Sequence, residues 1–162
     1  MKLPVALLCG LLPFALAAQP AANPSPASPV KLTPAEIVAE REKYAKEVRA
    51  LIAGHEKEPA ETVFKNIKVL KGVPAGRVPA IMNMGYGQSL GVSCTHCHVP
   101  GEWEKEDKPQ KQIAREMSKL SKTINEELLP KIANLDSAKP VVNCTTCHRG
   151  EIKPALNLVA RP

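Results

Sequence analysis

The sequence predicts a mainly helical domain with little regular strand. In residues 35–52 and 109–128, apolar side chains recur at steps of three and four among charged residues, which is the period of an amphipathic helix. Residues 77–90 also have the pattern of a short helix. Only residues 63–70 alternate in part, and they fit either a short strand or an extended crossing segment. We therefore expect one helical domain over residues 34–162.

The first helix has recognisable start and stop signals. Thr33 is suited to cap the helix and Pro34 to occupy its first turn. Gly54 and Pro59 are expected to end it. Its apolar positions are Ile37, Tyr44, Val48, Leu51 and Ile52. The apolar stripe of the helix over 109–128 consists of Ile113, Met117, Leu120 and Ile124.

The N-terminal residues have the pattern of an export signal. Residues 1–18 contain Lys2, an apolar run and the cleavage pattern Ala15-Leu16-Ala17, which is typical of a signal peptide, and the run is too short for an ordinary transmembrane helix. Residues 19–33 are rich in Pro, Ala and Ser and are expected to form a leader or tether. Cys9 would leave with the signal, although a lipoprotein cysteine is the alternative. We expect a periplasmic protein.

The chain contains the pentapeptide Cys-x-x-Cys-His twice, at residues 94–98 and 144–148. At this motif two cysteine sulfurs bind haem covalently, and the adjoining histidine becomes an axial ligand of the iron. The cysteines that remain after export supply four thioether bonds: Cys94, Cys97, Cys144 and Cys147. The sequence therefore predicts two covalently attached haem c groups, with His98 and His148 as axial ligands.

Other uses of paired cysteines fit less well. A four-cysteine zinc ribbon places its pairs roughly 15–20 residues apart, which is much closer than the two pairs here. A thioredoxin-like motif requires a strand–helix–strand setting, which the sequence does not indicate. Two ordinary disulfides would leave His98 and His148 without a role. Haem attachment is the interpretation that uses both histidines.

The chain has few aromatic residues, with 2 Phe, 2 Tyr and 1 Trp. A domain of this size usually obtains much of its buried apolar area from aromatic side chains. Two haem groups would supply the missing apolar bulk. The composition thus favours a core that is organised around cofactors.

The sixth ligand of each iron is the next question, because methionine raises the reduction potential relative to a second histidine. For the first haem, Met82 is the preferred candidate and Met84 the second. Gly85 follows Met82 by about one turn, and its lack of a side chain lets a flat macrocycle approach the backbone. A methionine that merely fills a core is the competing interpretation for each of them.

For the second haem, Met117 is the remaining methionine between the two motifs. A core-filling role competes closely with ligation here. His55 and His96 are alternatives that would give an iron with two histidine ligands. A solvated surface position is the simpler interpretation of His55, and either exposure or a contact with a neighbouring haem fits His96.

Several short stretches complete the order helix, haem motif, helix, haem motif. They are Val63–Leu70, the methionine-bearing helix, Gly91–His98, Asp107-Lys108-Pro109, Ala114–Met117, Ile124-Asn125, Cys144–Gly150 and Lys153-Pro154. Over roughly residues 62–156 the chain resembles the cytochrome subunit of photosynthetic reaction centres and its non-photosynthetic relatives. The resemblance implies a small multihaem cytochrome c with a methionine ligand on the helix before each haem motif, which also favours Met82.

The sequence departs from that family in two respects. The reaction-centre subunit carries four haems, whereas this chain has two motifs and corresponds to half of it, so photosynthesis does not follow. In the second helix, relatives often have a methionine one turn after Met117, where this chain has Leu120. If that later position is the ligand in the family, Met117 or a histidine must replace it here.

We expect an electron carrier rather than an enzyme, because a haem iron with both axial positions filled by protein passes single electrons. Its partners would be a redox protein donor and acceptor, such as a membrane-bound oxidoreductase or a reaction-centre-like complex. The alternative is a haem enzyme or a gas- or peroxide-binding protein, if the second iron is open. Its distal acid–base groups would come from few residues: His55, His96, Glu126 and Glu127.

The charge of the chain adds little to this. Its formal net charge is +6, and ionised haem propionates would cancel much of it. Lys105, Lys108 and Lys111 follow the first motif and would either steer an acidic partner or form a solvated helix face. Nucleic-acid binding is not expected, because basic and aromatic residues are not interleaved.

Overall fold

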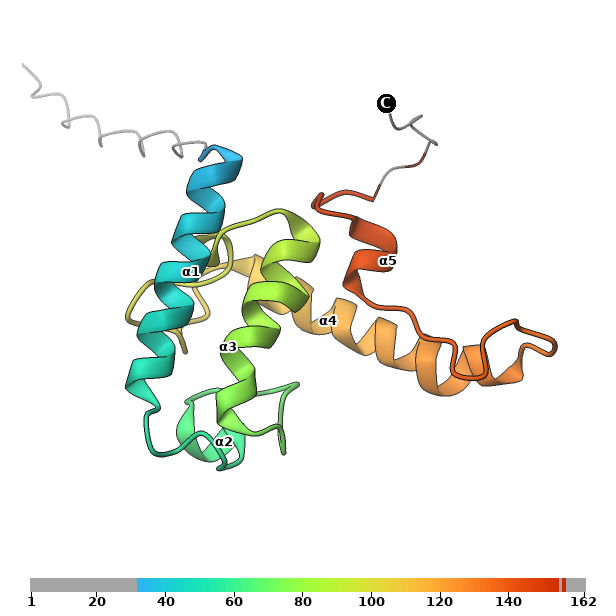
Figure 1. Cartoon of the computed structure of the whole chain (residues 1–162), viewed down its shortest axis with the longest axis horizontal. Helices are drawn as coiled ribbons and strands as arrows, with labels where there is room; N and C mark the ends of the chain where they lie inside the picture. The colour runs from blue at the N-terminus through green and yellow to red at the C-terminus, as the bar shows by residue number, and fades with distance from the viewer. Residues whose placement is uncertain (1–31, 155, 157–162) are drawn as a thin grey trace, which may run out of the picture. The chain divides into compact units, whose positions relative to one another are not determined.

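The computed structural model describes residues 32–154 and residue 156. The predicted signal peptide (1–18), and all but the last two residues of the predicted leader (19–33), lie outside the described residues. Within the described part the chain is helical, with two isolated β-bridges (Pro59–Pro74 and Val99–Glu102) and no strand (Figure 1). The expected mainly α fold class is confirmed. None of the helices in this part has the length and apolar character needed to span a bilayer.

Helix α1 spans Pro34–Leu51, close to the predicted 35–52. Thr33 and Glu36 form a capping box: the Thr33 hydroxyl accepts from the Glu36 backbone N–H at 3.3 Å, and the Glu36 carboxylate accepts from the Thr33 N–H at 2.7 Å. The chain leaves the helix through Gly54, whose φ of +89° is left-handed and favours glycine.

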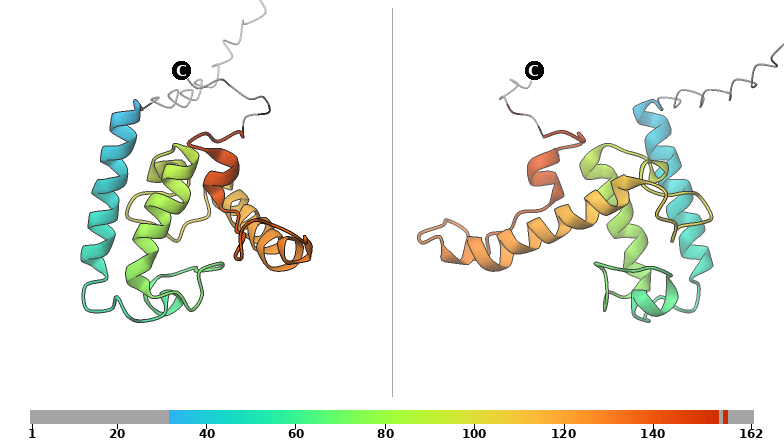
Figure 2. Two further views of the ribbon diagram at one scale, coloured as in Figure 1. Left: turned by 45° about the vertical axis from the view of Figure 1, so that its right-hand side comes forward. Right: turned by 180° about the vertical axis from the view of Figure 1, so that it is seen from behind.

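A second helical segment lies beside α1 (Figure 1, Figure 2). It comprises the 3₁₀ turn η1 (Ala75–Arg77), the short helix α3 (Val78–Ala80) and the π-helix η2 (Ile81–Gln88). The short helix predicted over 77–90 is therefore present, but its π geometry was not expected from the sequence. π-Helical turns widen the backbone ladder and occur frequently at functional sites.

The strand alternative for residues 63–70 is wrong. Val63 is the last residue of the short helix α2 (Ala60–Val63), and the residues after it form an irregular stretch. Asn66 has a φ of +62°, and this left-handed conformation interrupts the extended backbone that a strand needs. The stretch borders a cavity instead of joining a sheet.

Helix α4 spans Pro109–Thr123 and continues through the π-helix η4 (Ile124–Leu128) and the 3₁₀ turn η5 (Leu129–Lys131). The helix predicted over 109–128 is confirmed, with the same change to π geometry near its end. Asn125 connects this region to the stretch before α5 (Cys144–His148). Its amide donates to the Val142 carbonyl and accepts from the Val142 N–H, each at 2.8 Å.

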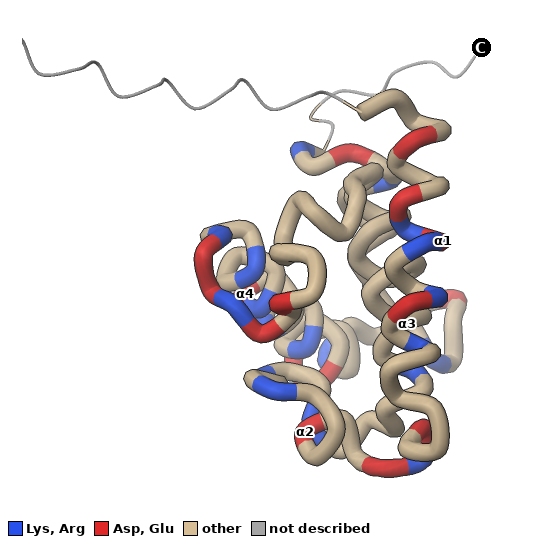
Figure 3. Tube along the Cα trace, turned by 90° about the vertical axis from the view of Figure 1, so that its left-hand side faces the viewer, with Lys and Arg blue, Asp and Glu red and all other residues tan. Residues whose placement is uncertain are grey.

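The apolar core of the described residues is built from small and medium side chains. Its members are Ala45, Ile52, Ala60, Ala75, Val78 and Val92. No large side chain in this part of the chain is fully buried. Charged residues of both signs lie along α1 and α4 (Figure 3). A core without a fully buried large side chain is the arrangement expected when a cofactor supplies the centre of the core.

Candidate haem-binding sites

The first Cys-x-x-Cys-His motif borders an apolar cavity. Cys94, Cys97 and His98 lie in its wall, and Met82 of η2 lines the same cavity. The remaining walls come from α1, the stretch 64–70 and the start of α4. Every aromatic side chain after the predicted signal peptide lines this one cavity: Tyr44, Phe64, Tyr86 and Trp103. The walls of this cavity therefore contain the aromatic side chains that the buried core lacks.

His98 is oriented by a backbone carbonyl. Its Nδ1 lies 3.1 Å from the carbonyl oxygen of Trp103 and donates to it, and its ring meets the Trp103 ring edge-on with centroids 5.8 Å apart. With Nδ1 protonated, Nε2 keeps the lone pair that a metal requires. Burial lowers the pKa of His98, and this effect exceeds that of the hydrogen bond to Trp103, which raises it. The imidazole is therefore neutral at physiological pH, as a metal ligand must be.

The cysteines of the first motif are available for covalent attachment. Neither Cys94 nor Cys97 forms a disulfide, and burial raises the pKa of both thiols. The short 3₁₀ turn η3 (Cys94–His96) begins the motif, and the His98 N–H donates to the Cys94 carbonyl at 3.0 Å. Cys94, Cys97 and His98 all line the same cavity.

Arg41 places a buried positive charge in the wall of this cavity. The residue is 8% exposed, and its Nε has no partner among the described residues. Its one hydrogen bond, from Nη1 to the Val92 carbonyl, is long at 3.5 Å. A buried charge with an unpaired donor is costly unless an acceptor completes it. The site thus fits an occupant that carries acceptor groups as well as a large apolar surface, and haem with its carboxylates is such a group.

The second motif forms the short helix α5 (Cys144–His148). Asn143 caps it by accepting from the Thr146 N–H at 3.1 Å, and the Thr146 hydroxyl accepts from the Asn143 N–H at 3.1 Å. His148 repeats the arrangement of His98, because its Nδ1 donates to the Glu151 carbonyl at 3.1 Å. The Cys144 and Cys147 thiols are free. Both motifs therefore present a histidine whose Nε2 is available for a metal.

The surroundings of the second motif are more open than those of the first. On α4 the predicted apolar stripe is exposed: Ile113 by 56%, Met117 by 41% and Leu120 by 50%. Met84 is also exposed and borders a surface depression with Gln88, Thr145, Arg149 and Gly150. Met84 thus lies beside the second motif and not in the first cavity, which the spacing of the sequence alone did not reveal.

The other predicted candidates lie elsewhere. His55 is exposed and pairs with Glu58 at 2.6 Å, which raises the pKa of its imidazole. His96 is half-buried within the first motif and does not line the cavity. Of the two alternatives for Lys111, the solvated helix face is wrong, because its side chain is buried. Glu126 and Glu127 are exposed in η4. Among the described residues, no cluster of three or more His, Cys, Asp or Glu could hold a metal ion by itself.

Hydrogen bonds connect Ser89, which directly follows η2, to the second motif and to Gly150 after it. The hydroxyls of Ser89 and Thr145 are 2.6 Å apart, and the Gly150 N–H donates to the Ser89 carbonyl at 2.9 Å. Tyr86 lines the first cavity, and its hydroxyl lies 2.6 Å from that of Ser118 on α4. Burial raises the pKa of Tyr86, and the nearby Cys144 adds to the increase. Tyr86 therefore lines the first cavity and also contacts α4 through its hydroxyl.

Two Cys-x-x-Cys-His motifs with oriented histidines, one of them facing an apolar cavity, define a c-type cytochrome. The comparison with known proteins identifies which kind. A sequence profile described as "Photosynthetic reaction centre cytochrome C subunit" matches residues 30–160, and the chain belongs to this family. A cytochrome c of this family binds haem c covalently and transfers electrons.

Individual relatives support the family assignment. The chain is 32% identical over 104 residues to the photosynthetic reaction center cytochrome c subunit of Thermochromatium tepidum, covering 64% of this chain and 24% of that protein. It is 31% identical over 83 residues to cytochrome c-554 of Chloroflexus aurantiacus, covering 51% and 20%. The corresponding subunit of Roseobacter denitrificans is 32% identical over 121 residues, covering 70% and 31%. The chain spans less than a third of the length of each.

Proposed function

We propose that this protein is a dihaem c-type cytochrome that carries single electrons between redox partners in the periplasm or cell envelope. The observation that carries the proposal is the repeated environment of the two histidines. His98 and His148 each follow a Cys-x-x-Cys pair, and each donates its Nδ1 hydrogen to a backbone carbonyl at 3.1 Å. When bound, haem iron alternates between Fe(II) and Fe(III) and so takes up one electron at a time.

In this proposal the chain supplies four covalent anchors and four axial ligands. The anchors are Cys94, Cys97, Cys144 and Cys147, and the histidine ligands are His98 and His148. Met82 is proposed as the sixth ligand of the first haem, because it lines the cavity that also contains the first motif. Met117 is proposed for the second haem because it is the methionine between the two motifs, on the helix that precedes the second one. Arg41 would offer its buried guanidinium to an acceptor group of the first haem.

The proposed location and partners rest on the sequence. Residues 1–18 have the signal-peptide pattern, and covalent haem attachment in bacteria takes place outside the cytoplasm. The partners would be a redox protein donor and acceptor, including a membrane-bound oxidoreductase or a reaction-centre-like complex. The match to reaction-centre subunits supports partners of this kind.

A haem enzyme or a gas-binding protein is the second candidate, and one observation favours it. Met84 lies in the depression beside the second motif, whereas Met117 lies on α4, and both side chains are exposed. If neither sulfur ligates the second iron, that iron would have an open position. Peroxide, nitric oxide or carbon monoxide would then bind there.

The deciding experiment is a haem count followed by spectroscopy of the ligands. We expect two covalently bound haems per chain by pyridine haemochromogen assay and intact mass. We also expect the oxidised protein to show a Met–Fe(III) charge-transfer band with the intensity of two methionine-ligated irons. A single haem, or none, would contradict the dihaem proposal. Binding of carbon monoxide to the native reduced protein would favour the enzyme or sensor alternative.

A further inference from the structure

Lys111 differs from the other lysines near the first motif because its side chain is buried. Only 10% of that side chain is exposed, whereas 44% of the Lys105 side chain is exposed. Lys111 also lines the cavity that contains His98. A buried ammonium group is costly unless it is hydrogen-bonded and paired. The partners of Lys111 therefore indicate why a charge is kept at this place.

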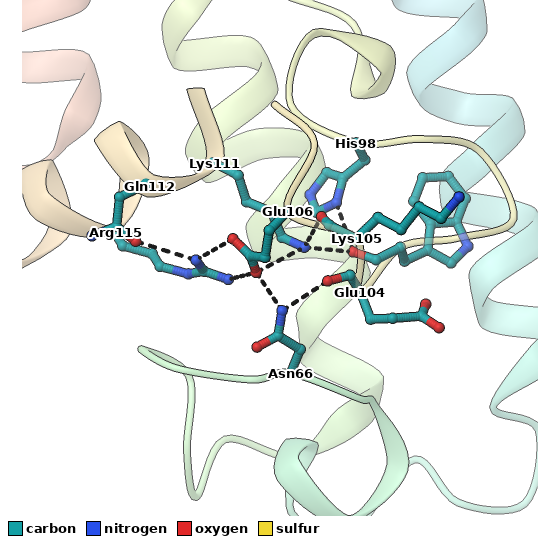
Figure 4. A network of polar contacts seen from close by, with 9 residues as sticks. Asn66, His98, Glu104, Lys105, Glu106, Lys111, Gln112 and Arg115 are labelled. Carbon is teal, nitrogen blue, oxygen red and sulfur yellow. Dashed lines mark hydrogen bonds and ion pairs between the residues drawn. The ribbon is translucent and has the colours of Figure 1, made fainter. Parts of the chain in front are cut away.

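The Lys111 ammonium shares a hydrogen-bond acceptor with His98. Its Nζ donates to the Trp103 carbonyl at 2.8 Å, and the same oxygen accepts from His98 Nδ1 at 3.1 Å. A carbonyl oxygen has two lone pairs and accepts both bonds. The ammonium is thus one acceptor atom away from the imidazole of the proposed axial ligand (Figure 4).

A set of polar contacts holds Lys111 in this position (Figure 4). Its Nζ also donates to the Lys105 carbonyl at 2.8 Å and lies 3.5 Å from Glu106. Arg115 binds the Glu106 carboxylate through two nitrogens, at 2.6 Å and 2.7 Å. Asn66 donates to the same carboxylate and, at 2.7 Å, to the Glu104 carbonyl.

The Glu106 carboxylate is ionised throughout the physiological range. Its hydrogen bonds to Arg115 lower the pKa of Glu106 to about 2. One carboxylate faces two cations, so Lys111, Glu106 and Arg115 together keep a net positive charge beside the cavity.

Two physical effects would act in the same direction on a haem iron held by His98. A hydrogen bond from Nδ1 to a carbonyl makes the imidazole a stronger electron donor and favours Fe(III). An ammonium that binds the same carbonyl draws on its electron density and weakens that donation. In addition, a positive charge in a site sheltered from water disfavours the more positive Fe(III) state. Both effects favour Fe(II).

We propose that Lys111 acts through the Trp103 carbonyl and His98 as a positioning residue that raises the reduction potential of the first haem. This inference rests on the proposed function, because it requires haem at Cys94 and Cys97. It concerns one haem only, since the carbonyl of Glu151 that accepts from His148 receives no lysine in the described contacts.

The test is a redox titration of the full-length protein, as wild type and as Lys111→Met. Methionine keeps most of the side-chain volume and removes the charge. We expect one of the two haems to become about tenfold harder to reduce at a fixed potential, which corresponds to about 59 mV for one electron. Lys111→Arg should remain near the wild type because it keeps the charge. Lys119→Met, on an exposed part of the same helix, is the matched control and should leave both potentials unchanged.

A second readout separates tuning from a merely structural role. We would measure the chemical shift of the His98 Nδ1–H group in reduced protein with ¹⁵N-labelled histidine. It should change in Lys111→Met and stay the same in Lys119→Met. Unchanged potentials and an unchanged resonance in Lys111→Met protein that keeps its haem would overturn the proposal.

A third variant covers the case in which Lys111→Met does not fold. Glu106→Gln removes the negative charge beside Lys111, so we expect the first haem to become easier to reduce. An unchanged or lowered potential in Glu106→Gln would overturn the inference. Failure of the proposed function is recognised separately, because wild-type protein would then contain no haem on the peptide with Cys94 and Cys97.

Discussion

Met82 and Met84 show how two neighbouring residues can serve different sites. They are two positions apart in η2, and side chains at i and i+2 on a helix do not share a face. Met82 lines the first cavity, whereas Met84 borders the depression beside the second motif. The sequence ranks both methionines as candidates for one iron. The structure separates their surroundings.

The methionines give a direct test with a built-in control. In Met82→Ala we expect the reduction potential of one haem to fall and its reduced iron to bind carbon monoxide, because a thioether ligand that favours Fe(II) has been lost. In Met84→Ala we expect that haem to keep its potential. Redox titration and carbon monoxide difference spectra of the two variants give the comparison. Identical titrations of wild type and Met82→Ala would refute the assignment.

Arg41 and Lys111 differ in how far the sequence predicts their burial. Arg41 falls on the apolar face of its helix, four residues after Ile37 and three before Tyr44, so periodicity offered a signal for its burial. Lys111 offered no such signal. Its burial depends on the carbonyls of Trp103 and Lys105, which approach it only because the loop after the first motif folds back on α4. The Cys-x-x-Cys-His motifs, in contrast, are local in sequence and predict their chemistry directly.

At the scale of elements, the two long amphipathic helices were predictable because their apolar period is local, and α1 also has a local cap. α1 and α4 begin at Pro34 and Pro109, and both starts were predicted. The π geometry of η2 and η4 was not predictable, because an i→i+5 ladder has no distinct hydrophobic period at this length. Residues 63–70 were ambiguous because partial alternation over eight residues does not separate a strand from an irregular stretch.

A substitution at Gly91 would test how closely α5 packs against η2. It has a φ of +65°, and a Cβ placed on it would lie 2.0 Å from the Gly150 carbonyl oxygen. Gly91→Ala should therefore bear the left-handed penalty of about 1–2 kcal/mol and a further overpacking penalty of about 1–3 kcal/mol. The measurement is chemical unfolding of the holoprotein, together with its haem content.

Gly72 is the matched control for this substitution. Its φ of +76° is similar, but nothing lies within 4 Å of an added Cβ. Gly72→Ala should lower the free energy of unfolding by the left-handed penalty alone, without the overpacking penalty. Equal losses in the two variants would show that the approach of Gly91 to Gly150 does not constrain the packing of α5 against η2.

At the scale of the whole molecule, few contacts connect the surroundings of the two motifs. Ser89 contacts Thr145 and Gly150 through one hydroxyl and one carbonyl. Tyr86 reaches α4 through Ser118. Both connections start from the helical segment that carries Met82. This segment therefore contacts both the first cavity and the second motif, so a change in its position would affect both proposed haem sites.

Removing the hydrogen bond between Tyr86 and Ser118 would show how strongly η2 and α4 are coupled. Tyr86→Phe keeps the ring in the cavity wall and removes the hydroxyl, while Ser118→Ala removes its partner on α4. Each single variant should lower the free energy of unfolding by about 1 kcal/mol, and the double variant should lose less than the sum, because both substitutions break the same bond. Chemical unfolding of the four holoproteins gives the coupling energy. If the losses add, the bond does not couple α4 to η2. A coupling of about 0.5 kcal/mol or more would instead establish Tyr86 as a link that both haem sites share.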